Sequence, residues 1–137
     1  MRRLPAVATG TLLWMTLGCG PGLRNTPTEP APCVNVAGSY VSSYGNSCGR
    51  FSTGDAATLT QSGCTVEGTV SGVGALTGTI SDNTVTWTVE FAGDCKGTGT
   101  GVGEIKGKQI SGNYAGFQTG TGCCATTVSG TFSLSLR

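Results

Sequence analysis

The stretch VEGTV at residues 66–70 recurs as LTGTI at 76–80, ISGNY at 110–114 and VSGTF at 128–132. In each copy the large apolar residues and a central glycine alternate with Ser, Thr, Glu or Asn, so that one face is apolar and the other polar. This period of two is typical of a half-buried antiparallel strand. A glycine on the buried face lets a sheet curve sharply or accept a bulky neighbour. The repeat therefore predicts a small, strongly curved β-sheet.

The same alternation extends outward from these copies. It is clearest at residues 84–91, where Val85, Trp87, Val89 and Phe91 share one face. It is weakest at residues 98–106, where alternate glycines supply little to bury. Eight strands are predicted, at residues 36–43, 56–61, 64–70, 76–80, 84–91, 98–106, 109–115 and 126–136.

Short connections between these strands favour antiparallel hairpins over helical crossovers. Eight antiparallel strands with one apolar face can close into a barrel, in which the two edge strands form hydrogen bonds with each other. We therefore predict an all-β domain at residues 33–137, built as an eight-stranded antiparallel up-and-down barrel, with a two-sheet β-sandwich as the alternative. The 24 glycines among 137 residues agree with a turn-rich β protein.

Two short features resemble known small barrels. Gly38-Ser39-Tyr40, near the start of the first predicted strand, resembles the Gly-x-Trp motif of lipocalins and avidins, with Tyr in the place of Trp. Arg137, which closes the last strand, resembles the basic residue that packs over this aromatic in lipocalins. The resemblance implies a lipocalin-like barrel shape and no particular ligand.

The N-terminus has the pattern of an export signal. Basic Met1-Arg2-Arg3 precedes a mostly apolar stretch, residues 4–17, which is too short to span a bilayer permanently. Leu17-Gly18-Cys19 resembles the lipobox of bacterial lipoproteins, whereas an ordinary cleaved signal is the alternative. The resemblance implies a signal peptide at residues 1–18, fatty acylation of Cys19, palmitate included, and export to the periplasm with the membrane as a partner. Gly20 in place of Asp favours, by the same resemblance, the outer membrane.

Residues 19–32 are predicted to be the lipidated cysteine and a tether. They hold four of the five prolines and show no alternation. Such a composition favours an extended, hydrated chain over a packed element. A tether of this kind is what an N-terminal lipid anchor needs.

The seven cysteines agree with this anchor. If Cys19 carries lipid, an even number remains to form disulfides in an oxidising compartment, namely Cys33, Cys48, Cys64, Cys95, Cys123 and Cys124. Connections in a meander alternate between its two ends, which places Cys33 and Cys64 at one end and the other four at the opposite end. Disulfides need Cα separations below about 7 Å. We therefore predict a Cys33–Cys64 bridge, and bridges from Cys48 and Cys95 to Cys123 and Cys124 in either order.

The predicted connections are tight at one end and long at the other. The long loops, at residues 44–55, 71–75, 92–97 and 116–125, are the expected place for a local function. Candidates to bind a ligand or partner there are Tyr44, Arg50, Phe51, Asp94, Lys96 and Phe117, with Asp55 also at this end. The alternative is that these are ordinary solvated loop residues.

Several kinds of chemistry are disfavoured. Without Arg2 and Arg3, six of the eight basic residues remain against seven acidic ones, so the charge gives no case for nucleic acid. The chain has no histidine, the commonest general base and metal ligand. Asp55 with Asp94 could form a carboxylate pair, but seven scattered acidic residues make such a pair unspecific. We expect no enzyme activity, no cofactor and no metal.

Two functions are compatible with these features. The first is an exported, membrane-tethered interaction module that contacts a protein through its long loops. The second is a binding protein that holds a small apolar molecule or a glycan in the barrel mouth. The volume of the barrel interior distinguishes these two functions, because a filled interior leaves no room for a ligand. We expect Tyr40, Trp87, Tyr114 and Phe132 to fill the space left by the glycines, which favours the first.

Overall fold

A computed structural model describes residues 31–137 of the chain. The predicted signal peptide, Cys19 and all of the tether up to residue 30 lie outside the described residues. Within residues 31–137 no helix is long and apolar enough to cross a membrane.

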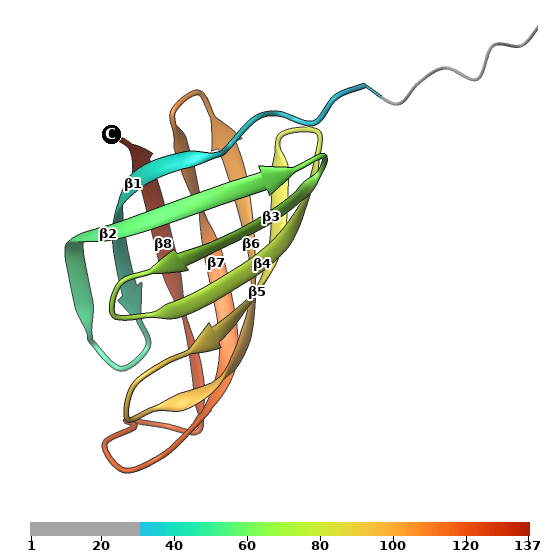
Figure 1. Cartoon of the computed structure of the whole chain (residues 1–137). Coiled ribbons are helices and arrows are strands. Elements are labelled where there is room, and N and C mark those ends of the chain that lie inside the picture. The colour runs from blue at the N-terminus through green and yellow to red at the C-terminus, as the bar shows by residue number, and fades with distance from the viewer. Residues whose placement is uncertain (1–30) are drawn as a thin grey trace, which may run out of the picture. The chain divides into compact units, whose positions relative to one another are not determined.

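The described chain forms a closed antiparallel barrel of eight strands in sequence order (Figure 1). The strands are β1 (Gly38–Asn46), β2 (Phe51–Ser62), β3 (Thr65–Val70), β4 (Gly74–Ser81), β5 (Thr84–Phe91), β6 (Lys96–Lys106), β7 (Gln109–Thr119) and β8 (Thr127–Leu136). The barrel closes where β1 pairs with β8, from Tyr40 opposite Leu136 to Asn46 opposite Gly130. The predicted up-and-down barrel is confirmed, and the sandwich is not formed.

The strands run further than predicted at one end. The tight turns are two residues each, at 63–64, 82–83 and 107–108, as expected. At the other end β2 already begins at Phe51 and β7 continues to Thr119, so the predicted loops 44–55 and 116–125 shorten to 47–50 and 120–126. The β1–β2 ladder continues past a bulge between Ser42 and Ser43. The hydrogen bonds of the neighbouring strand thus hold residues of low β propensity in the sheet.

The glycine-rich β6 is a full strand of 11 residues because aromatic rings cover its glycines. Gly99, Gly101 and Gly103 are buried on its inner face. A Cβ at Gly99 would lie 3.1 Å from the Phe91 ring, and one at Gly103 would lie 3.0 Å from the Phe132 ring. The apolar surface that this strand lacks is therefore supplied by residues of β5 and β8.

The segment before β1 closes one end of the barrel. Val36 is only 3% exposed and belongs to the core. Its backbone N–H donates to Oε1 of Gln61 at 2.7 Å, and its carbonyl accepts from the Tyr40 hydroxyl at 2.8 Å. Cys33 is bonded to Cys64, with their Cα atoms 5.3 Å apart. We call this the closed end, and the opposite one the mouth.

The feature that resembles lipocalins lies at the closed end. The backbone N–H of Arg137 donates to the Ser39 carbonyl at 2.9 Å, and the Arg137 side chain is exposed.

Candidate functional site

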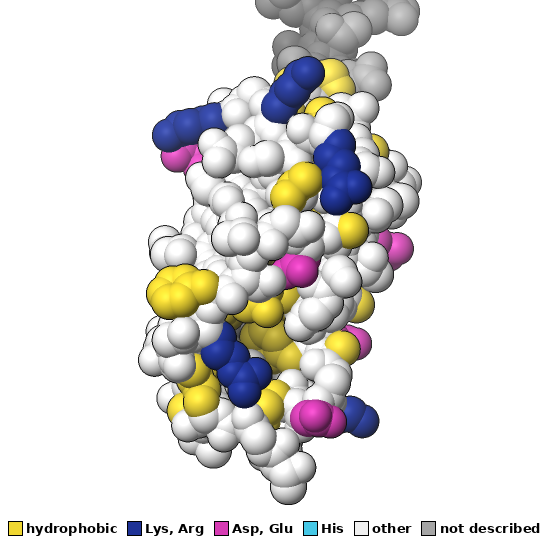
Figure 2. Space-filling view, turned by 90° about the vertical axis from the view of Figure 1, so that its left-hand side faces the viewer, with side chains coloured by type: hydrophobic (Ala, Val, Ile, Leu, Met, Phe, Trp, Pro, Cys, Tyr) yellow, Lys and Arg dark blue, Asp and Glu magenta, His cyan; other side chains and the backbone are white. Residues whose placement is uncertain are grey.

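The mouth half of the barrel contains a cavity of about 320 Å³. A space-filling view shows a hollow with hydrophobic walls and a basic side chain beside it (Figure 2). Residues of β1, β3, β4, β5, β7 and β8 line this cavity, together with the loops 47–50, 71–73, 92–95 and 120–126. The barrel is therefore packed in its closed half and hollow in its mouth half.

The aromatic side chains occupy the space left by the glycines, as expected, but they do not fill the interior of this half. Tyr40 is buried in the packed half, but Trp87, Tyr114 and Phe132 line the cavity. The reason lies in the glycines across from them. A Cβ at Gly101 would collide with the Trp87 indole, and a Cβ at Gly130 would lie 2.9 Å from the Tyr114 hydroxyl. The glycines let these rings lie against the wall, so the centre stays open.

Aromatic and aliphatic side chains together line the cavity. The ring centroids of Trp87 and Phe132 are 4.5 Å apart with planes at 52°, and those of Phe91 and Tyr114 are 6.4 Å apart at 59°. Such tilted arrangements are favourable between aromatic rings. The aliphatic lining consists of Val70, Val73, Leu76, Val89 and Leu134. An apolar ligand would therefore meet side chains that already pack against one another.

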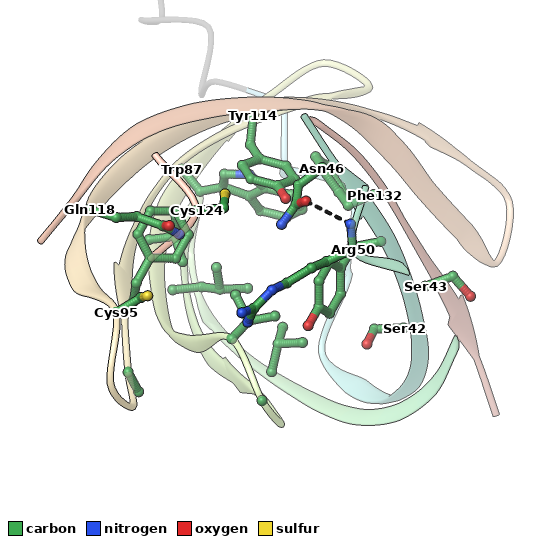
Figure 3. A pocket seen from close by; sticks show the side chains of 18 of the residues that line it. Ser42, Ser43, Asn46, Arg50, Trp87, Cys95, Tyr114, Gln118, Cys124 and Phe132 are labelled. Carbon is green, nitrogen blue, oxygen red and sulfur yellow. Dashed lines mark hydrogen bonds between the residues drawn. The ribbon is translucent and has the colours of Figure 1, made fainter. Parts of the chain in front are cut away.

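Arg50 is the basic residue of the lining. The backbone N–H groups of Cys48 and Arg50 both donate to Oδ1 of Asn46, at 3.0 and 3.1 Å, in an Asx-type turn. Arg50 in turn donates from its guanidinium to the Gly122 carbonyl at 3.3 Å. Figure 3 shows its side chain reaching across the cavity, with the hydrogen bond from its backbone N–H to Asn46 drawn as a dashed line. The short loop 47–50 thus places a cation over the opening.

Two disulfides hold the loops around the mouth. Cys48 is bonded to Cys124 and Cys95 to Cys123, with Cα separations of 5.9 and 5.2 Å. All three predicted bridges are thereby confirmed, and the order left open among four of the cysteines is settled. Cys95 and Cys124 also line the cavity. The mouth therefore combines three cross-linked loops with the ends of the strands.

The surroundings of Tyr114 alter the pKa of its phenol. Burial raises the pKa of Tyr114 above its ordinary value, and the neighbouring Tyr44 raises it further. The Tyr114 phenol therefore stays protonated at neutral pH and can donate a hydrogen bond. Ser42, which is 1% exposed, lines the cavity at its deepest point on β1, and its hydroxyl has no partner among the described residues.

Three of the six candidate binding residues line the cavity, namely Tyr44, Arg50 and Asp94. The others do not line it. Lys96 is exposed at the start of β6, and Phe51 and Phe117 are 81% and 68% exposed on the barrel surface. Asp55 lies on β2 and accepts a hydrogen bond from Ser52, so it does not share the cavity with Asp94.

Other polar residues of the lining are not among those predicted: Ser42, Ser43, Asn46 and Gln118. The last two belong to strand ends that the sequence pattern places in loops. On β1 the signal was present, because Ser42 and Asn46 continue the alternation that begins at Tyr40.

Among residues 31–137 no cluster of three or more His, Cys, Asp or Glu side chains could hold a metal ion. No protein family, no curated protein and no solved structure matches the chain.

Proposed function

We propose that this protein is an exported, lipid-anchored, non-enzymatic binding protein that holds a small, mostly apolar molecule in the mouth half of its barrel. The observation that carries this proposal is the cavity of about 320 Å³ with aromatic and aliphatic walls. Ligand pockets range over about 300–1,000 Å³ and are mostly apolar with a few placed polar groups. This cavity lies at the small end of that range, which favours a compact ligand.

Export is supported by the three disulfides, which are typical of oxidising compartments. The anchor rests on the lipobox-like Leu17-Gly18-Cys19 and on the proline-rich residues that follow. Cys33, where the tether would join the barrel, is at the closed end, so the mouth is the end away from the attachment point. Intact mass of the protein purified from bacterial membranes tests the anchor, with Cys19→Ser as the control that should lose the lipid.

Ligand binding can be tested with N-phenyl-1-naphthylamine, an uncharged apolar fluorophore, added to the full chain with its disulfides intact. We expect its emission to rise and to saturate at one molecule per chain. Leu76→Phe, which adds volume at the cavity wall, should weaken binding at least several-fold. Val102→Phe is the matched control, because Val102 is an exposed residue on the outside of β6 and should leave binding unchanged. Absence of saturable binding by the unchanged protein would refute the proposal.

A second candidate is contact with a partner through the exposed aromatics Phe51 and Phe117. Large exposed aromatic side chains are common at interaction sites. The same fluorophore separates the two functions. If Phe51→Ser with Phe117→Ser abolishes its binding while Leu76→Phe does not, the apolar site is on the surface and not in the cavity.

A further inference from the structure

The two charged side chains that line the cavity, Arg50 and Asp94, form no ion pair with each other. Among residues 31–137 the only ion pair joins Lys106 to Glu104, at 2.9 Å, in the exposed closed-end part of β6. Arg50 therefore has no carboxylate partner within the described chain, although Asp94 lies on the same rim. A guanidinium carries five N–H donors in a planar fork. The one side-chain hydrogen bond of Arg50 among the described residues, to Gly122, leaves most of this fork free.

The other polar groups of the lining also offer donors. The Asn46 carbonyl oxygen is occupied by two backbone N–H groups, which turns its amide into a donor toward other partners. Tyr114 and Tyr44 add phenolic hydroxyl groups, which can donate, and Gln118 adds a second amide. A ligand with acceptor oxygens at one end would match this set, whereas an ammonium group would face the Arg50 guanidinium, with Asp94 on the rim as the one carboxylate of the lining.

Accepting the proposed function, we propose that the ligand is a compact monocarboxylic acid whose apolar body lies between the aromatic and aliphatic walls and whose carboxylate is held by Arg50 at the mouth. A planar carboxylate fits the guanidinium fork through two parallel hydrogen bonds. One basic residue in the lining matches a single negative charge better than a doubly charged phosphate. The cavity volume restricts the body to a small ring system or a short chain.

The test compares three probes of nearly equal shape by calorimetric titration of the full chain: 2-naphthoate, uncharged 2-naphthamide and cationic 2-naphthylmethylamine. We expect 2-naphthoate to bind about threefold more tightly than 2-naphthamide, because the exposed Arg50 guanidinium adds a charge-assisted hydrogen bond that solvent partly screens. The amine should bind more weakly than either. Arg50→Gln should remove the preference, so that 2-naphthoate and 2-naphthamide bind with equal affinity.

Two further variants make the result specific to Arg50. Lys108→Gln removes one positive charge at a closed-end turn and should preserve the preference. Arg50→Lys keeps the positive charge but not the planar guanidinium, and should retain part of the preference for 2-naphthoate. Circular dichroism of each variant verifies the fold.

The outcomes are distinct. Equal affinity for 2-naphthoate and 2-naphthamide, a preference that survives Arg50→Gln, or tighter binding of the amine would overturn the carboxylate assignment and leave the proposed cavity function standing. Failure of all three probes and of N-phenyl-1-naphthylamine to bind the unchanged protein would overturn both.

Discussion

Gln61 accepts the backbone N–H of Val36 through its side-chain oxygen at 2.7 Å. The same amide donates from Nε2 to the carbonyls of Val34 and Gly63, at 3.0 and 2.8 Å. One side chain on β2 thus holds the segment that closes the barrel and the turn beside it. This amide acts together with the Cys33–Cys64 bridge, the buried Val36 side chain and the Tyr40 hydroxyl bond in holding the closed end.

Gln61→Ala should therefore lower the free energy of unfolding by about 1–3 kcal/mol, because the Val36 N–H loses its partner in a partly buried site. Urea unfolding monitored by circular dichroism measures this. Gln109→Ala is the control, since Gln109 is exposed at the same end, and a change within about 0.5 kcal/mol is expected. Equal losses in the two variants would contradict this role for Gln61.

The disulfides at the two ends should differ more in their effect on ligand binding than in their contribution to stability. Removing Cys33–Cys64 or Cys48–Cys124 by paired Ser substitutions opens loops of 31 and 76 residues. Chain entropy then predicts losses of about 3.7 and about 4.5 kcal/mol. We expect N-phenyl-1-naphthylamine binding to weaken only in the second variant, because Cys124 lines the cavity. Titration at a temperature where both variants stay folded checks this, and equal weakening in both would show that the mouth bridge has no special part in binding.

Gly101→Ala should destabilise the barrel by about 1–3 kcal/mol, because the added methyl group collides with the Trp87 indole. The cause can be isolated in a double-mutant cycle with Trp87→Leu, measured by urea unfolding. The alanine should cost clearly less in the Trp87→Leu background, where the collision is relieved. Additive effects would mean that the cost comes from the backbone at position 101 and not from the ring.

Ser42→Ala should stabilise the unliganded protein, by about 1 kcal/mol, because it removes a buried hydroxyl that has no hydrogen-bond partner among the described residues. Thermal and urea unfolding both report this. Ser39→Ala, at an exposed position of the same strand, should stay within about 0.5 kcal/mol. A destabilised Ser42→Ala protein would indicate that the hydroxyl has an acceptor in solution.

The fold was predictable because its signal is local and repeated. Period-two alternation at residues 66–70, 76–80 and 84–91 is sufficient to define strands, and short turns then impose the meander. The meander sorts the cysteines by end, which predicts Cys33–Cys64 uniquely. It cannot separate Cys123 from Cys124, since neighbours in the chain share one loop and their pairing depends on its exact path.

The candidate site was less predictable because it depends on contacts across strands. Residues 51–55 contain Gly and Asp, which have low strand propensity, and only their pairing with β1 keeps them in the sheet. The hollow mouth depends on where rings lie. The Trp87 ring packs against Gly101 on β6, and the Tyr114 hydroxyl lies against Gly130 on β8. The residue pattern along one strand does not show these contacts between strands. It does place Tyr44 and Arg50 at the mouth end of the barrel.

The placement of aromatic rings against glycines has a consequence for how this barrel can diverge. The width of the cavity is determined by side chains that lie along the wall, whereas the number of strands and their register determine the scaffold. Replacing Trp87 or Phe132 by a smaller side chain would widen the cavity without moving a backbone hydrogen bond, and restoring the ring would narrow the cavity again. Single substitutions could thus change the volume and shape of the interior, while the disulfides and the strand pairing stay unchanged.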